Sequence, residues 1–169
     1  MSLALKIQGG VWLFDDNIDT DQILPGYAMA APRERLKEYA LAGSSYADFA
    51  QRVKKGDIIA AGKNFGCGSS REQAPVALKE AGVSLIIAQS FARIFRRNCI
   101  NIGLPVLIAD LSTHLKQEDE IVVDLKEAKI TVVGSGVQIL GKPLSPGTLE
   151  TLACGGLINK VRKQFGLGL

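Results

Sequence analysis

The sequence predicts a single α/β domain over residues 1–169, and three observations support this fold class. Residues 57–109 alternate between apolar strand-like runs and helical patterns, which favours a parallel sheet with helical crossovers. After residue 120 the pattern changes to short strands separated by turn residues. With 169 residues, 47% of them hydrophobic, the chain can bury one core of ordinary domain size.

The first third of the chain combines a strand with polar and apolar turns. In order, its expected elements are a strand over residues 3–14 broken by Gly9-Gly10, a polar turn over 15–21, an apolar loop over 23–31 and a helix over 33–41 that follows Pro32. We interpret the apolar loop as packed under the domain. The alternative is that it covers a ligand or a partner, because exposed apolar surface often marks a binding site.

The middle of the chain supplies the parallel sheet, and the last third supplies shorter strands. The expected strands are 57–61, 84–88, 104–109, 121–125, 129–133 and 137–140, and the expected helices are 72–81, 91–99 and 157–165. The last three strands indicate a β-meander or a small barrel. In the helix over 91–99 we expect Phe91, Ile94 and Phe95 to share one face. Its arginines are interpreted as a solvated or partner-facing edge.

Composition and charge exclude several classes of function. The net charge is only +3 and aromatic residues make up 6% of the chain, which argues against nucleic-acid binding. No apolar run approaches the ~20 residues that a membrane-spanning helix needs. The first residues lack a secretory pattern, so we expect a cytoplasmic protein with no membrane partner.

The cysteines and the histidine form no local metal-ligand pattern. Cys67, Cys99 and Cys154 lie far apart in the sequence, with no CxxC pair, and His114 is the single histidine. We therefore expect no metal site in this chain, and reduced thiols in place of disulfides. Cys99 and Cys154 are predicted to be buried packing residues and His114 to be solvated. Cys67 lies in a glycine-rich turn, which leaves a nucleophilic thiol as an alternative.

That glycine-rich turn, residues 64–72, carries the residues best suited to chemistry. Its glycines allow the backbone to approach a ligand closely, and the predicted helix after it directs free N–H groups at an anion. Ser69 and Ser70 provide hydroxyl groups, and Arg71 provides a planar donor group suited to a carboxylate or a phosphate. The turn therefore predicts a site for a small polar acid.

A structural interpretation of the same turn competes with the functional one. Either Ser69 or Ser70 could cap the helix, with Glu72 or Gln73 completing a capping box. The predicted turn follows a strand, however, and α/β sheets bind their ligands at the carboxyl ends of their strands. For this reason we favour the functional interpretation.

Three motifs together carry a resemblance to a known family. They are Asp19-Thr20-Asp21-Gln22-Ile23-Leu24-Pro25, Gly66-Cys67-Gly68-Ser69-Ser70-Arg71-Glu72 and Ser90-Phe91-Ala92-Arg93-Ile94-Phe95. In this order they resemble the small subunits of isopropylmalate isomerases, and the likeness extends over essentially the whole chain. The resemblance implies a swivelling β/β/α domain of the aconitase C-terminal type. It also implies a separate large catalytic subunit that carries a [4Fe-4S] cluster, with no cofactor in this chain.

The resemblance also implies roles for individual residues. Ser69 would be the catalytic base, acting as an alkoxide that backbone N–H groups of the turn stabilise, and Ser70 would support it by hydrogen bonding. Arg71 would hold a substrate carboxylate, and Gly68 would lie against the substrate. Asp21 resembles the active-site aspartate of the family and would orient a histidine of the large subunit.

The segment Tyr27-Ala28-Met29-Ala30 stands where related enzymes read Tyr-Leu-x-x and select their substrates. Homoaconitase-like members have an arginine at the third of these positions, whereas this chain has Met29, which suits an apolar substituent. We therefore predict an alkylmalate substrate such as 3-isopropylmalate, with Met29 and Ala28 as substrate contacts. Because Ala28 replaces a leucine, 2,3-dimethylmalate and citramalate-type acids stay open, as does a homoaconitase-type activity.

The predicted function is therefore the small subunit of an alkylmalate hydro-lyase. It would interconvert 2-isopropylmalate and 3-isopropylmalate through 2-isopropylmaleate, a step of leucine biosynthesis. Two alternatives are an assembly module without catalytic residues and a stand-alone thiol enzyme that uses Cys67. In the absence of its partner the chain could form a homo-oligomer.

Overall fold

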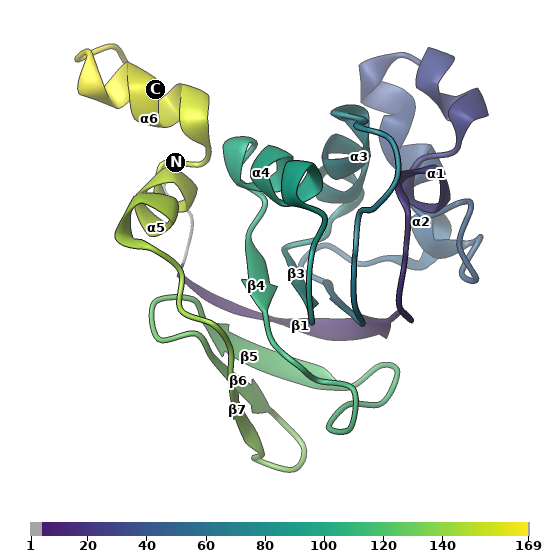
Figure 1. Cartoon of the computed structure of the whole chain (residues 1–169), viewed down its shortest axis with the longest axis vertical. Helices are drawn as coiled ribbons and strands as arrows, with labels where there is room; N and C mark the ends of the chain where they lie inside the picture. Colours follow the sequence, from purple (N-terminus) through teal and green to yellow (C-terminus); the bar gives the residue numbers. More distant parts are fainter. Residues whose placement is uncertain (1–4, 169) are drawn as a thin grey trace.

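A seven-stranded mixed sheet forms the centre of the protein in the computed structural model, which describes residues 5–168 (Figure 1). The strand order is β4-β3-β2-β1-β5-β6-β7. β1 pairs in parallel with β2 and antiparallel with β5, so it joins a parallel half to an antiparallel half. The strands are β1 (Lys6–Leu13), β2 (Ile58–Ala61), β3 (Leu85–Ala88), β4 (Val106–Ile108), β5 (Glu120–Asp124), β6 (Lys129–Val132) and β7 (Gln138–Leu140).

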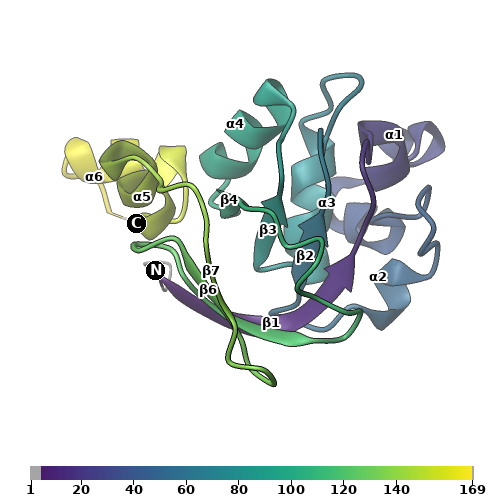
Figure 2. The same ribbon diagram turned by 60° about the horizontal axis from the view of Figure 1, so that its bottom comes forward.

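Helices pack against the parallel half of the sheet and near the N-terminal end of β1 (Figure 2). They are α1 (Thr20–Ile23), α2 (Phe49–Arg52), α3 (Gln73–Ala81), α4 (Arg93–Asn101), α5 (Pro146–Ala153) and α6 (Leu157–Gln164), with 3₁₀ helices η1 (Gly26–Ala30) and η2 (Arg33–Tyr39). In both views α5 and α6 lie on the opposite side of the molecule from α1 and α2. The crossovers through α3 and α4 confirm the predicted α/β class.

One prediction about the strands was wrong, and the structure decides between two alternatives left open for the last three strands. Gly9-Gly10 do not break the first strand, because β1 pairs with β5 through both glycines. Gly9 is needed for close packing, since a Cβ there would collide with the carbonyl oxygen of Gly56. Of the two alternatives for the three C-terminal strands, the meander is confirmed: they extend the main sheet through β1 and do not close into a barrel.

The helices also differ from the sequence-based expectation in three places. The segment after Pro32 is the 3₁₀ helix η2. The single turn of α2 was not predicted, because four residues carry too little periodicity to detect. α5 was missed because Pro146 was taken as the end of the preceding strand. Pro146 instead begins the helix, and the Ser145 side chain caps it by accepting from the Thr148 N–H group.

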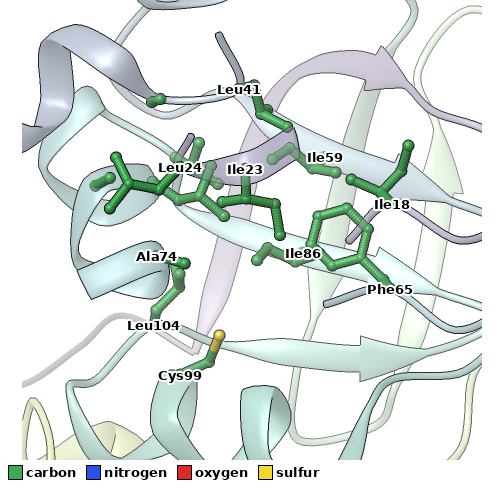
Figure 3. Close-up of a cluster of buried hydrophobic side chains, with 14 of the residues drawn as sticks. Ile18, Ile23, Leu24, Leu41, Ile59, Phe65, Ala74, Ile86, Cys99 and Leu104 are labelled. Carbon is green, nitrogen blue, oxygen red and sulfur yellow. The ribbon is translucent and has the colours of Figure 1, made fainter. Parts of the chain in front are cut away.

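The apolar loop after α1 packs inside the domain, as predicted. Ile23 and Leu24 are fully buried in one hydrophobic cluster with Phe65 of the glycine-rich turn and Ala74 of α3 (Figure 3). The exceptions are Gly26, Ala30 and above all Tyr27, which has 72% of its surface exposed. The segments that carry the three motifs are therefore anchored on one core.

Candidate functional site

The connections that follow β1, β2 and β3 lie side by side and extend the parallel sheet beyond its strands. An isolated β-bridge pairs Asp19 with Cys67, and a second pairs Phe65 with Phe91. Backbone hydrogen bonds join these connections, from Gly66 N to Ile18 O (2.7 Å) and from Phe65 N to Ser90 O (3.0 Å), among others. The three motifs, which are far apart in the sequence, therefore meet at one place.

The two glycines of the turn are required by its backbone conformation. Gly66 has φ +81° and Gly68 has φ +98°, in the region that favours glycine. A Cβ at Gly66 would also collide with the ring of Phe95, which packs edge-to-face on Phe65 with ring centroids 5.5 Å apart. At Gly68 a Cβ would lie 3.2 Å from Thr20 Oγ1. The turn thus sits tightly between α1 and α4.

Ser69 and Ser70 are exposed and do not cap the following helix. α3 begins at Gln73 with Glu72 as its N-cap residue, and no side chain there makes a capping hydrogen bond. The capping interpretation of the serines was therefore wrong, because the turn continues past both of them before the helix begins. Their hydroxyl groups stay available for a ligand.

Thr20, the first residue of α1, holds Ser69 in place. Its buried hydroxyl group donates to Ser69 O at 2.8 Å, and its Oγ1 lies 3.4 Å from Ser69 Oγ. The sequence did not indicate this contact, because the two residues are 49 positions apart. α1 itself is fixed by a capping box in which Asp19 and Gln22 exchange side-chain to backbone hydrogen bonds of 2.8 and 3.0 Å.

Arg71 and Asp21 form an ion pair beside the serines. Arg71 Nη1 donates to Asp21 Oδ1 at 3.0 Å and to the carbonyl oxygen of Leu24 at 2.7 Å. Within residues 5–168, neither Nε nor Nη2 of Arg71 makes a hydrogen bond, so these groups can receive a carboxylate. The Asp21 side chain is 69% exposed and also accepts from the Gly26 N–H group at 3.2 Å.

A pocket of about 200 Å³ lies over these groups, between the glycine-rich turn and α4. Its lining residues are Thr20, Gly66, Gly68, Ser69, Ser70, Arg71, Ala92, Arg93, Ile94, Phe95 and Asn98. Four predicted site residues, Gly68, Ser69, Ser70 and Arg71, are therefore brought together, and Asp21 joins them through Arg71.

The residues of α4 that line this pocket were not predicted as site residues. Ile94 was expected to share one face with Phe95, and the two side chains differ in their environment: Ile94 is 45% exposed whereas Phe95 is 3% exposed. Adjacent residues lie about 100° apart around a helix, so the two side chains point to different sides. The motif that begins at Ser90 was the available signal for Arg93 and Ile94.

The structure does not bring Ala28 or Met29 into the pocket. Ala28 is 1% exposed and belongs to the hydrophobic core, so it offers no surface to a ligand in this conformation. Met29 is half-buried against the same core. The segment does adjoin the site, because the N–H group of Gly26 at the start of η1 binds Asp21.

Metal-ligating and thiol groups are scattered. Within the described part of the chain, no three His, Cys, Asp or Glu side chains gather where they could hold a metal ion. The three cysteines are free; Cys99 is buried, whereas Cys154, predicted to be buried, is partly exposed. Burial raises the pKa of the Cys99 thiol well above its ordinary value. His114 is exposed, as predicted.

None of the helices described in the structure combines the length and apolar character that a membrane span requires.

One protein family and several known proteins match this chain over the residues of the candidate site. The aconitase C-terminal domain family matches residues 15–110, which include all three motifs. The methanogen homoaconitase small subunit of Methanothermobacter thermautotrophicus is 49% identical and covers 96% of this chain and 95% of the relative. The isopropylmalate/citramalate isomerase small subunit of Methanocaldococcus jannaschii is 45% identical and covers 94% of this chain and 95% of the relative. The 3-isopropylmalate dehydratase small subunit of Halothermothrix orenii is 46% identical and covers 94% of this chain and 96% of the relative.

A solved structure shows the same fold. The crystal structure of 3-isopropylmalate dehydratase from Methanocaldococcus jannaschii has a TM-score of 0.89 to this chain, with 40% identity and 95% coverage of both chains. Relatives of 45–49% identity are thus named for different substrates. The choice of substrate must be argued from the site.

Proposed function

Since the chain belongs to the aconitase C-terminal domain family, we propose that it is the small subunit of a heteromeric hydro-lyase that acts on alkylmalates. The leading reaction is the interconversion of 2-isopropylmalate and 3-isopropylmalate through 2-isopropylmaleate. The observation that carries the proposal is that an accessible Ser69 hydroxyl and the free donors of Arg71 line one pocket. The names of the relatives as small subunits support a separate large subunit.

The reaction moves water across a carbon pair, and the residues of this chain suit one half of it. Ser69 Oγ, as an alkoxide, takes the proton from the carbon next to a carboxylate. Thr20 Oγ1 lies 3.4 Å from Ser69 Oγ, so its hydroxyl group can rotate to donate to the alkoxide. Arg71 holds a substrate carboxylate through Nε and Nη2, while Nη1 stays on Asp21 and Leu24 O. Ser70 lines the same pocket, where its exposed hydroxyl group can support the alkoxide or the substrate by hydrogen bonding.

The large subunit supplies the rest of the site in this proposal. A [4Fe-4S] cluster bound there provides a Lewis acid for the leaving hydroxyl group. The exposed Asp21 carboxylate is available to orient a histidine of that subunit, since among residues 5–168 Arg71 and Gly26 engage Oδ1 and leave Oδ2 without a hydrogen bond. The three free cysteines support a cytoplasmic location.

Met29 supports an alkyl group as the variable part of the substrate. It is an uncharged side chain in η1, and η1 is tied to Asp21 through Gly26. A methionine cannot pair with the additional carboxylate of a tricarboxylic acid. 3-Isopropylmalate is therefore preferred over homoaconitate-type acids, with 2,3-dimethylmalate and citramalate as rivals that differ only in their alkyl groups.

The test combines this chain anaerobically with its cluster-loaded large subunit and follows the ultraviolet absorbance of unsaturated acids. We expect consumption of 2-isopropylmaleate by the pair and by neither subunit alone, faster than consumption of dimethylmaleate. Ser69→Ala should lower kcat by about 10²- to 10⁴-fold, the usual contribution of general base catalysis. Full activity of Ser69→Ala and Arg71→Ala would leave the chain as an assembly module, and loss of activity in Cys67→Ser alone would indicate a thiol enzyme.

A further inference from the structure

A second hollow adjoins the site pocket, between α4 and α5. This groove has a volume of about 660 Å³ and is lined by Arg93, Ile94, Arg96, Arg97, Ile100, Asn101 and Thr148. Arg93 and Ile94 also line the site pocket, so the two hollows share one rim. Whatever fills the groove therefore borders the proposed active site.

The groove is strongly positive and its charges are not neutralised within the domain. Among the described residues, Arg93, Arg96 and Arg97 take part in no ion pair and in no side-chain hydrogen bond, and α4 contains no acidic residue. Moreover, Nε of Arg96 is buried without a hydrogen-bond partner. A buried donor without an acceptor is unfavourable, so the Arg96 side chain would gain a hydrogen bond by turning toward an acceptor that a partner brings to the groove.

We propose that the α4 groove binds a carboxylate-bearing segment of the large subunit, and this inference rests on the proposed function. Three unpaired guanidinium groups within five residues are complementary to acidic side chains, while Ile94 and Ile100 provide apolar contact between them. Occupation of the groove would place the large subunit against Arg93 and Ile94, the rim that the groove shares with the pocket of Ser69 and Arg71. Docking and completion of the active site would then be one event.

Two other occupants fit the groove less well. A second copy of this chain in an isologous contact would set the arginines of one copy against those of the other, which is repulsive. A free small anion would use only part of an open groove that runs along α4 and includes two isoleucines. An extended segment with both acidic and apolar side chains matches the whole surface.

The decisive variant is Arg97→Glu, because Arg97 lines the groove and not the site pocket. Lys126→Glu is the matched control: it makes the same charge change at an exposed lysine in the turn between β5 and β6. For Arg97→Glu we expect a Kd for the cluster-loaded large subunit about tenfold higher at low ionic strength, through a slower association rate. This difference should shrink as salt rises, since screening weakens the wild-type attraction. Arg97→Lys should keep most of the affinity.

Turnover at saturating large subunit should be unchanged in Arg97→Glu, which separates docking from catalysis. Equal Kd values for Arg97→Glu and Lys126→Glu, with an active wild-type complex, would overturn the inference and leave the proposed function intact. A wild-type chain that neither binds the large subunit nor supports turnover would overturn both. Saturable binding of citrate to the isolated chain that Arg97→Glu abolishes would make the groove a small-anion site. Self-association abolished by this change would make it an interface between copies.

Discussion

Replacing Thr20 by valine would remove a hydroxyl group that holds Ser69, with little change in side-chain shape. Thr20 is 3% exposed, donates to Ser69 O at 2.8 Å and lies 3.4 Å from Ser69 Oγ. The effect of this change on turnover and its effect on stability are expected to differ, because in the proposed reaction Ser69 Oγ becomes charged whereas Ser69 O stays neutral.

The expected loss of stability is small. A typical hydrogen bond contributes about 0.5–1.5 kcal/mol, and because Ser69 is exposed, water can replace the donor to its carbonyl oxygen, so we expect the lower end of this range. The expected loss of turnover is larger. A hydrogen bond to a charged oxygen contributes about 1.5–3 kcal/mol, which corresponds to roughly ten- to 150-fold in rate. The 3.4 Å separation is long, so we predict about a tenfold lower kcat.

The assay is steady-state hydration of 2-isopropylmaleate by the reconstituted complex, together with thermal unfolding of the isolated chain. Thr20→Ser keeps the hydroxyl group and should restore most of the turnover. Thr151→Val is the matched control, because Thr151 is also buried and donates to Gly147 O at 2.9 Å, but within α5. It should affect stability alone. A Thr20→Val variant with normal kcat and KM would refute the idea that Thr20 supports Ser69 during catalysis.

Three further predictions concern backbone strain, thiol ionisation and substrate choice. Gly66→Ala should lower the free energy of unfolding by more than about 1 kcal/mol, measured in urea, because φ is +81° and the new Cβ would meet the Phe95 ring; unchanged stability would mean that the turn can shift. Cys99 should resist iodoacetamide at pH 8 while Cys67 reacts, as peptide mass spectrometry would show, because burial raises the Cys99 pKa. Equal labelling of Cys67 and Cys99 would contradict this prediction. Because the pKa of Cys99 is raised in the folded state, the contribution of this thiol to the free energy of unfolding is fully present below about pH 8.5, the ordinary thiol pKa, and is lost as pH rises through the folded-state pKa. Met29→Arg should lower kcat/KM for 2-isopropylmaleate by about tenfold or more and favour a homoaconitate-type substrate, and an unchanged preference would place specificity elsewhere.

Local sequence patterns were sufficient to predict most of the strands and α3. Runs such as Ile58–Ala61 and Leu85–Ala88 are short and apolar because both faces of a parallel sheet are buried, and this signal needs no knowledge of distant residues. The same kind of reasoning failed at Gly9, where a glycine usually marks a turn. Its reason lies in Gly56, which approaches from 47 positions further along the chain.

The candidate site shows the same limit more clearly. The motif around Ser69 and Arg71 could be recognised, but its working contacts join residues about 50 positions apart, Thr20 with Ser69 and Asp21 with Arg71. No local pattern encodes such pairs. Local reasoning also suggested that the serines cap α3, because a serine near a helix start usually does so. Only the folded turn shows that the helix begins later and that neither hydroxyl group caps it.

The core holds the candidate site rigidly but does not enclose it, and both properties are those of an active site shared between two proteins. Leu24 is fully buried, and its carbonyl oxygen accepts from Arg71, so the packing of α1 on the core fixes the guanidinium group. Yet the pocket that this rigid arrangement lines has a volume of only about 200 Å³, below the roughly 300–1,000 Å³ of typical ligand sites. Ser69, Ser70 and Asp21 are exposed. A base that works as an alkoxide needs a site from which water is excluded. This chain provides fixed groups without that enclosure, which supports a second protein surface as the missing wall of the site.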